Sequence, residues 1–312
     1  MSDPGIEALQ SKIGRVREQV GRRIVGQREI VEQLLACVLC DGNALLESNP
    51  GLGKTSLVRT LAAVTDLEFS RIQNTPDLMP SDVTGTEIIR ETEDGREFVF
   101  ERGPIFANAV LADEINRATP KTQAALLEAM QEKQVTAAGE TYDLPRPFFV
   151  LATQNPIDQG GTYPLPEAQI DRFTMKILVE YPTFEEEREI VALYTEGEVE
   201  PEVEQVVTRA EIREMQSLVR QVPIAEDLRD RAVELVRETR TVEDIEYGAS
   251  PRASMGLVLA AKARAFLQGR THVSREDVAA MAPPVLRHRV VLDFRAERGG
   301  LTPDDVIRSL LE

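Results

Sequence analysis

Several residue types are scarce in this sequence of 312 residues, and each scarcity excludes a class of protein. Only two cysteines are present, Cys37 and Cys40, which excludes a disulfide-bonded scaffold. They lie three residues apart in an apolar run, so a helix would carry both on one face. With no second CxxC pair and only two histidines, we expect core packing rather than half of a metal site.

Long apolar runs are also missing. No window reaches the roughly 18 apolar residues that a membrane-spanning helix requires, and residues 1–20 carry too many charges for a secretory signal. We therefore expect a soluble, cytoplasmic protein without membrane insertion. Hydrophobic residues still make up 42% of the chain, which is enough to bury a core.

Lysine and tryptophan are the remaining shortages. The chain has 6 Lys beside 30 Arg, no Trp, and 53 acidic residues, for a net charge of −17. Such a chain repels phosphate backbones, and its longest basic run is Arg22-Arg23, so nucleic acid is not the expected partner. An acidic, lysine-poor surface suits concentrated salt, which favours a halophilic archaeal source. The alternative is an ordinary acidic bacterial protein.

The spacing of apolar residues predicts an α/β fold in the first part of the chain. Strands are expected at 44–46, 67–73, 109–112, 148–152 and 174–179, with helices at 6–20, 27–39, 57–64 and 122–131. Alternating strands and helices predict a parallel sheet sandwiched by helices. After residue 182 only helical periods remain, at 184–194, 210–222, 226–238, 251–267, 275–282 and 303–311. We expect an α/β domain over 1–182 and a smaller all-α domain over 183–312.

A glycine-rich loop carries the strongest functional signal. Gly51-Leu52-Gly53-Lys54-Thr55 follows a predicted strand and precedes a predicted helix, so backbone N–H groups converge on one anion site. Lys54 is expected to reach the β- and γ-phosphates, and Thr55 to hold Mg²⁺. The nucleotide-binding residues expected here are Asn49, Pro50, Gly51, Leu52, Gly53, Lys54, Thr55 and Ser56.

One position departs from the usual pattern G-x-x-x-x-G-K-[ST]. Ser48 stands where the first glycine is usual. If the backbone needs a positive φ there, serine costs about 1 kcal/mol. In that case we expect slower ATP turnover.

Two further strand ends supply polar side chains. An apolar strand ends in Asp113 and Glu114, and adjacent residues at a strand end point differently. We assign Asp113 to magnesium and Glu114 to general base catalysis. The next buried strand delivers Asn155, which could orient the attacking water, although Asn-Pro is also a common turn signal.

The order of these motifs resembles the MoxR family of AAA+ ATPases, in the helix-2-insert clade. The most similar stretches are GPIFAN at 103–108, DEINRA at 113–118, KTQAALLEAM at 121–130, ATQNP at 152–156 and GTYPLPEAQ at 161–169. The similarity runs from about residue 26 to residue 252. It implies a P-loop NTPase core followed by a helical lid.

The resemblance also implies roles for individual residues. Val25 and Gly26 lie in a segment similar to the family's adenine-packing loop, and Asn155 corresponds to sensor 1. Arg172 stands where AAA+ proteins carry the arginine finger that acts in trans on a neighbouring subunit. Arg252 resembles sensor 2, and positive potential is expected at Lys54, Arg252 and a neighbour's Arg172. Without the resemblance, both arginines would be interpreted as surface or salt-bridging residues.

Two predicted hairpins interrupt the α/β part. Short β-prone runs flank Asp94-Gly95 within 86–101 and Ala138-Gly139 within 134–144. They resemble the helix-2 insert and the pre-sensor-1 insert. Their tips could contact a client protein, line a ring pore, or only stiffen a subunit interface.

The resemblance implies a Mg²⁺-dependent ATPase that forms a homo-oligomeric ring, expected to be a hexamer, and that remodels, assembles or activates partner proteins. Clients with a von Willebrand A domain, or metalloenzymes, are typical of the family. A magnesium-chelatase-like motor subunit would have the same architecture. An ATP-binding scaffold with little turnover and a nucleic-acid motor are the alternatives from other classes.

Overall fold

The computed structural model describes residues 4–92, 95–137, 139–155, 161–196 and 201–312. Its centre is a five-stranded sheet of β1 (Ala44–Ser48), β2 (Phe69–Gln73), β5 (Ala109–Asp113), β8 (Phe149–Gln154) and β9 (Met175–Val179). The strand order is β2-β5-β8-β1-β9, and every neighbouring pair is parallel. The predicted parallel sheet is confirmed. Strand β1, which lies between β8 and β9, leads directly into the glycine-rich loop.

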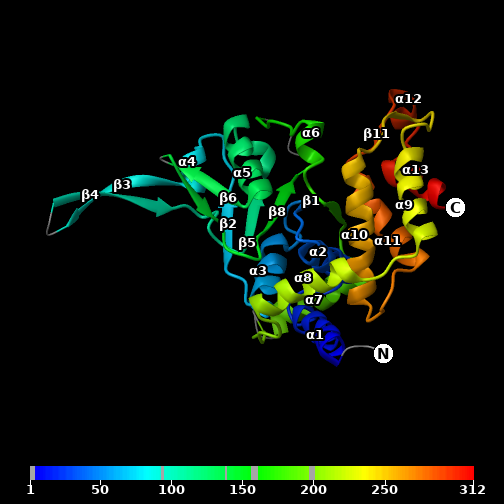
Figure 1. Cartoon of the computed structure of the whole chain (residues 1–312), viewed down its shortest axis with the longest axis horizontal. Coiled ribbons are helices and arrows are strands. Elements are labelled where there is room, and N and C mark those ends of the chain that lie inside the picture. Colours follow the sequence, from blue (N-terminus) through cyan, green and yellow to red (C-terminus); the bar gives the residue numbers. More distant parts are fainter. Residues whose placement is uncertain (1–3, 93–94, 138, 156–160, 197–200) are drawn as a thin grey trace.

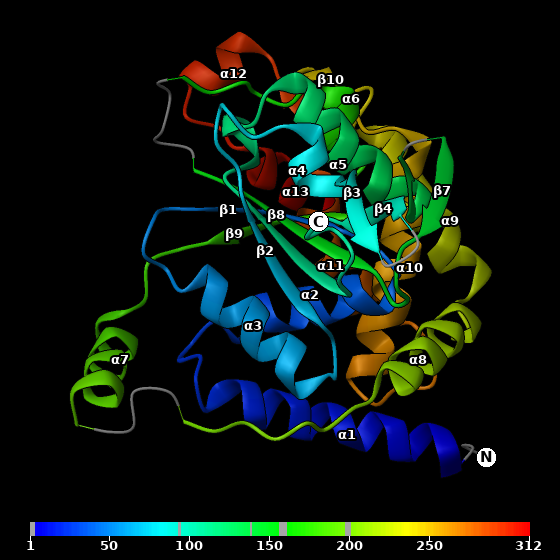
Figure 2. The ribbon, with the colours of Figure 1, turned by 90° about the vertical axis from the view of Figure 1, so that its left-hand side faces the viewer.

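Helices cover both faces of this sheet because its strands are apolar on both sides. Leu46, Leu111 and Leu151 belong to the core cluster that includes α1 (Pro4–Gly21), α2 (Arg28–Leu39) and α3 (Lys54–Val64). Their neighbours Leu45 and Val110 face the opposite way, toward α5 (Pro120–Glu132) and the short α4 (Pro80–Thr84). Figure 2 shows the sheet between these two helical layers.

Both expected hairpins are present. The first pairs β3 (Gly85–Thr92) with β4 (Gly95–Arg102) and extends far from the rest of the molecule (Figure 1). The second pairs β6 (Gln134–Ala137) with β7 (Glu140–Asp143). The ring of Phe100 in β4 stacks on Tyr142 in β7, with centroids 4.3 Å apart, and so joins the two hairpins. Asp94 and Ala138, where turns were expected, lie outside the described residues.

The remainder of the chain is mainly helical, as expected. The main helices are α7 (Phe184–Glu196), α8 (Arg209–Gln221), α9 (Glu226–Glu238), α10 (Pro251–Leu267), α11 (Arg275–Leu286) and α13 (Pro303–Leu311). One hydrophobic cluster runs from α1–α3 into α8, α9, α10 and α11, so the helical part shares a core with one face of the sheet. The division at residue 182 remains a prediction.

Several short elements escaped the sequence patterns. They are η1 (Ile115–Arg117), α6 (Glu167–Ile170), α12 (Phe294–Arg298) and an antiparallel pair of β10 (Ile245–Tyr247) with β11 (Val291–Leu292). Such short segments have no readable period. Helix α11 also continues past the predicted end at residue 282, through Pro283 and Pro284. Proline is a poor helix residue, but the N–H of Arg287 still bonds the carbonyl oxygen of Pro283.

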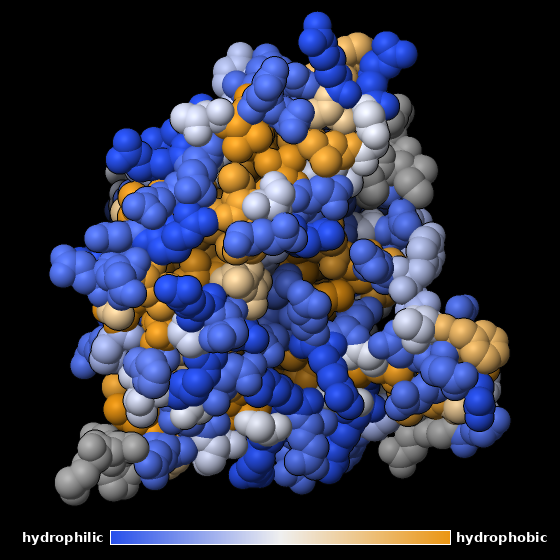
Figure 3. Space-filling model, turned by 90° about the vertical axis from the view of Figure 1, so that its right-hand side faces the viewer, coloured by the Kyte–Doolittle hydropathy of each residue, from blue (hydrophilic) through white to orange (hydrophobic). Residues whose placement is uncertain are grey.

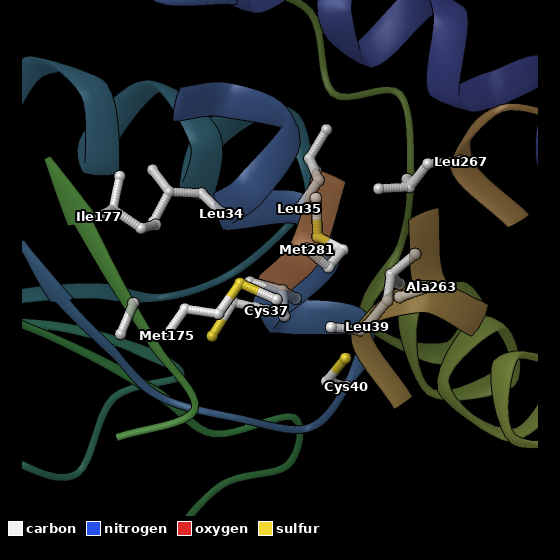
Figure 4. Close-up of a cluster of buried hydrophobic side chains, with 14 of the residues drawn as sticks. Leu34, Leu35, Cys37, Leu39, Cys40, Met175, Ile177, Ala263, Leu267 and Met281 are labelled. Atoms are coloured by element: carbon white, nitrogen blue, oxygen red, sulfur yellow. The ribbon is translucent and has the colours of Figure 1, made fainter. Parts of the chain in front are cut away.

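The two cysteines pack in the core, as predicted. Cys37 and Cys40 are buried among Leu34, Leu39, Met175, Ala263 and Met281, where α2 meets β9 and the helices α10 and α11 (Figure 4). Burial raises the pKa of the Cys40 thiol to about 12, so the thiolate form is suppressed. No cluster of His, Cys, Asp and Glu suited to a metal ion occurs among the described residues.

None of the helices in the described part of the chain combines the length and the apolar composition needed to cross a bilayer.

Candidate active site

The glycine-rich loop connects β1 to α3 at the carboxyl edge of the sheet, where parallel α/β sheets bind ligands. Gly51 and Gly53 have φ values of 83° and 74°, a backbone region that glycine adopts at little cost. Gly53 is also the N-cap of α3 and has no side chain with which to bond the first-turn N–H groups. Those groups and the helix dipole remain available to an anion.

Ser48 does not strain this loop. It is the last residue of β1 and pairs with Val179 of β9. Its φ is not in the positive range. Its buried hydroxyl donates a hydrogen bond of 3.1 Å to the carbonyl oxygen of Asn49. The cost considered for serine therefore does not arise, because the left-handed turns fall on Gly51 and Gly53.

Asp113 at the end of β5 is held from both neighbouring strands. Arg71 of β2 places a guanidinium nitrogen 2.6 Å from Oδ2, and the Thr153 hydroxyl of β8 donates to Oδ1 at 2.7 Å. The carboxylate is almost buried, so these charge-assisted bonds fix its direction.

Glu114 turns away from the line of the strand. Its φ is 54°, in the left-handed region that non-glycine residues rarely adopt, and its N–H donates to the Thr153 hydroxyl at 2.9 Å. The carboxylate Oε2 accepts hydrogen bonds from Gln73 at 3.1 Å and Arg117 at 3.2 Å. Residues with such an unusual backbone conformation cluster at functional sites, and here the residue is an acid.

A single cavity of about 270 Å³ joins these parts. Its lining residues are Pro50, Gly51, Leu52, Gly53, Lys54, Thr55, Ser56, Arg71, Asp113 and Glu114. The phosphate loop and the acidic pair are therefore brought together, as the sequence predicted. Arg71 was missed, because only the position of β2 beside β5 places it at the site.

Asn155 and the loop of Val25 and Gly26 are not among the residues that line this cavity, although both lie on elements next to it. Asn155 follows β8, the strand between β5 and β1, and is partly buried. The side-chain amide of Gln27 donates to the Leu52 carbonyl at 3.3 Å and ties its loop to the phosphate loop. Val25 is partly buried just before it. Gly26 has a φ of 66°, a conformation that favours glycine, and the flexible Glu186 side chain of α7 lies over it.

The two arginines expected from the resemblance lie elsewhere. Arg172 is partly exposed in the turn before β9, and Arg252 lies in the first turn of α10. Asp171, the residue before Arg172, accepts bonds from Arg289 at 2.7 Å and Ser250 at 3.1 Å, and pairs with Arg252 at 3.5 Å. Arg71 lines the cavity together with Lys54, and Arg252 is not among its lining residues. The roles expected for Arg172 and Arg252 stay predictions.

Comparisons with known proteins identify the family of this chain. Residues 43–175 match a family described as ATPase family associated with various cellular activities (AAA), and residues 237–310 match an AAA lid domain. The chain is 44% identical to Chaperone MoxR1 of Mycobacterium tuberculosis, over 99% of this chain and 83% of the relative. It is 30% identical to Protein MoxR of Methylorubrum extorquens, over 96% and 93%. The chain belongs to the MoxR family of AAA+ ATPases.

A solved structure supports the family assignment. The crystal structure of a candidate ATPase from Cytophaga hutchinsonii matches this MoxR-family chain with a TM-score of 0.91 and 43% identity, over 97% of this chain and 94% of that one. The AAA match includes the phosphate loop, Asp113, Glu114, Asn155 and Arg172, and the lid match includes Arg252. Val25 and Gly26 precede both matches.

The residues of the cavity fit a nucleotide with Mg²⁺. The loop offers backbone N–H groups and Lys54 to phosphate oxygens, while the Thr55 hydroxyl and the Asp113 carboxylate supply the oxygen ligands that Mg²⁺ prefers. The Arg71 guanidinium lies 2.6 Å from one oxygen of this carboxylate and fixes its position beside the phosphate loop.

Proposed function

We propose that this MoxR-family protein is a Mg²⁺-dependent ATP hydrolase that works as a homo-oligomeric ring of six subunits and acts as a chaperone-like motor. The observation that carries the proposal is the single cavity lined by the phosphate loop, Asp113 and Glu114. A loop that only bound nucleotide would not need a general base beside its phosphate site. Ser48 was the residue that favoured the alternative of an ATP-binding scaffold with little turnover. It adopts an unstrained backbone conformation in β1.

Each site residue then has a role. Lys54 pairs with the phosphates, and Thr55 and Asp113 hold Mg²⁺, which when bound neutralises charge on the β- and γ-phosphate oxygens. Glu114 takes the proton from the attacking water, and Asn155 orients that water. Gln73 and Arg117 share the Glu114 carboxylate and position it. Val25 and Gly26 contact the adenine.

Arg172 and Arg252 act in trans in this proposal. Neither lines the cavity of its own chain, and both lie next to Asp171. Asp171 also binds Arg289, whose guanidinium is nearly buried and donates to the carbonyl oxygen of Phe173 at 2.6 Å. This network connects the turn that carries Arg172 to α10 and to the end of α11, so a lid movement would move Arg172 as well.

Two substitutions test the hydrolase. Lys54→Ala should abolish ATP binding, measured by fluorescence of a labelled nucleotide. Glu114→Gln should bind ATP as the wild type does but lose hydrolysis by 10²-fold or more, the order expected for a general base. Glu128→Gln, on the exposed face of α5, is the matched control and should hydrolyse normally. Wild-type turnover by Glu114→Gln would refute the assigned base.

The client is proposed from the family alone: a protein with a von Willebrand A domain, or a metalloenzyme. The net charge of −17 favours a protein over a nucleic acid as the partner. We also propose a cytoplasmic location and the division into residues 1–182 and 183–312. A Glu114→Gln chain held in ATP should retain its client, and mass spectrometry of the retained proteins would identify it. Enrichment of nucleic acid instead would contradict the proposed client class.

A further inference from the structure

Three consecutive residues follow α11 and bind the backbone around the start of β9. Arg287 donates to the carbonyl oxygen of Lys176 at 3.2 Å, and the His288 ring nitrogen Nε2 lies 3.0 Å from the carbonyl oxygen of Phe173. Arg289 donates to the same Phe173 oxygen at 2.6 Å. This Arg-His-Arg segment therefore connects the helical part of the chain to the edge of the sheet.

Arg289 donates more hydrogen bonds than the other two residues. Its Nε bonds the Asp171 carboxylate at 2.7 Å. Its terminal nitrogens bond the carbonyl oxygens of Asp171, Phe173 and Thr174 at 3.0, 2.6 and 3.2 Å, and a further bond goes to the Val285 carbonyl of α11. Each nitrogen of the guanidinium is therefore used, and four of the five bonds hold residues 171–174.

The burial of Arg289 is unusual for a charged side chain. In Figure 3, which looks onto the helical part, hydrophilic side chains cover most of the face, with hydrophobic ones between them. The Arg289 side chain is only 2% exposed, and arginine is almost never fully buried unless it is paired. A buried ion pair adds little net stability over well-packed apolar residues. We therefore attribute to Arg289 a role in fixing geometry.

Arg172 lies in the middle of the turn that Arg289 holds. The residues on either side of it, Asp171 and Phe173, both bond Arg289. The Arg172 side chain is partly exposed, and it forms no hydrogen bond or ion pair with the residues of its own chain that the structure describes. The backbone of the turn is thus fixed, while the Arg172 guanidinium remains available outside the chain.

The Asp171 carboxylate also holds the second arginine that the resemblance assigns to a neighbour's site. It accepts a hydrogen bond of 3.1 Å from the hydroxyl of Ser250 and pairs with Arg252 at 3.5 Å. Ser250 is the N-cap of α10, and Arg252 lies in the first turn of that helix. Through Asp171, Arg289 fixes the turn of Arg172 relative to Arg252.

We propose that Arg289 is a positioning residue for the ATP site of the neighbouring copy, and that it acts by holding the turn from which Arg172 reaches that site. The inference rests on the proposed function, in which Arg172 acts in trans. Arg289 itself does not line the cavity of the phosphate loop. A displacement of about 1 Å at a reacting group can cost about 100-fold in rate, so the bonds to residues 171–174 control hydrolysis from a distance.

Mixed rings separate the two sides of each ATP site. Lys54→Ala chains should bind no ATP but still supply Arg172, and Arg172→Ala chains should bind ATP but supply no arginine. Arg289→Gln is added either to the Lys54→Ala chain, the donor, or to the Arg172→Ala chain, the acceptor. In the donor it should lower phosphate release by about 10-fold to 100-fold, whereas in the acceptor it should leave the rate unchanged. A general loss of stability would affect both mixtures alike.

Arg289→Gln should fold, because Asp171 is not left without partners. Its carboxylate keeps the bonds from Ser250 and Arg252, and it lines a cavity of about 380 Å³. Arg289→Lys is a second, milder variant. The ammonium keeps a positive charge beside Asp171 but lacks the planar fork that bonds several oxygens at once. It should give a smaller loss, again only in the donor.

Arg287→Gln is the matched control. Arg287 belongs to the same segment, is mostly buried and pairs with Asp304 at 2.8 Å, but it bonds the Lys176 carbonyl rather than residues 171–174. Its substitution should lower the free energy of unfolding, measured in urea, without an effect that is specific to the donor.

Three results would overturn the proposal: equal losses in donor and acceptor, full activity with Arg289→Gln in the donor, or an equal donor-specific loss with Arg287→Gln. The mixture of Lys54→Ala with Arg172→Ala alone tests the foundation. If that mixture regains no activity, the trans arrangement of the proposed function is wrong and this inference fails with it.

Discussion

Ser48 shows how a single residue in a motif can be judged only with its backbone in view. The usual glycine at this position suggests a need for conformational freedom, yet Ser48 is an ordinary β1 residue and the left-handed turns lie at Gly51 and Gly53. We therefore expect Ser48→Gly to leave ATP hydrolysis unchanged. Glycine should lower the free energy of unfolding by about 0.5–1 kcal/mol, since it is more flexible in the unfolded chain. Urea unfolding measures the free energy of unfolding, and a steady-state assay measures ATP hydrolysis. A clear gain in turnover would show that serine impairs the loop.

Arg71 is a residue of the site that the sequence did not reveal. Lys54, Thr55, Asp113 and Glu114 could be assigned from the sequence because each lies in a recognisable local pattern. Arg71 lies in an unremarkable strand and reaches Asp113 only because β2 pairs with β5. Strand order is a tertiary property, so no local signal marks this residue.

At the scale of single elements, α11 depends on a buried carboxylate at its N-terminus. Asp277 bonds the N–H and hydroxyl of Ser274 in a capping box, at 2.9 and 3.1 Å, and it pairs with Arg264 at 2.7 Å and with Arg270. Burial by itself would raise the pKa of Asp277, but the bonds from Arg270, Ser274 and Arg264 hold it below the usual value. The folded state therefore favours the ionised form.

We expect Asp277→Asn to destabilise the protein by about 1–3 kcal/mol near neutral pH, because the buried carboxylate bonds two partly exposed guanidinium groups, Arg264 and Arg270, and only Arg264 keeps a second partner, Glu32 at 3.4 Å. A lowered pKa stabilises the fold above the unfolded value of about 3.9, and this contribution is lost as the pH falls through the lower folded value. The difference in the free energy of unfolding between wild type and variant should therefore shrink below about pH 4. Chemical unfolding at several pH values measures it.

A matched control for Asp277 is available in α13. Asp305 occupies the same place in the capping box that begins with Thr302, but it is only partly buried. Asp305→Asn should lower the free energy of unfolding by clearly less than Asp277→Asn does. Equal losses would show that capping, rather than the buried ion pairs, explains the stability of α11.

At the scale of the assembly, hydrolysis should require two chains. Arg172→Ala should bind ATP normally but lose about 10³-fold or more in turnover, the order that an arginine supplied in trans contributes. Lys54→Ala chains cannot bind ATP but still offer Arg172 to a neighbour. A mixture of these two inactive variants should regain activity, measured as phosphate release against the mixing ratio. Full activity in isolated wild-type monomers would contradict the trans model.

The charge of the whole molecule leads to a separate prediction. Fifty-three acidic residues repel one another in dilute buffer, and salt near 1 M shortens the screening length to about 3 Å. If the protein is adapted to concentrated salt, its free energy of unfolding should rise from dilute buffer to molar KCl. Thermal unfolding across a KCl series measures this. Full stability in dilute buffer would instead identify an ordinary acidic protein.

The sequence by itself determined the parts of the protein that are local in the chain. Helix periods, strand runs, the glycine-rich loop and the acidic strand end depend on neighbouring residues, and so the fold class and the residues of the phosphate site could be predicted. The tertiary structure alone decided how distant segments meet. It placed Arg71 on Asp113, and it joined Arg252 and Arg289 to Asp171 beside Arg172. Those relations depend on strand order and on the docking of the helical part, which hydrophobic periodicity does not encode.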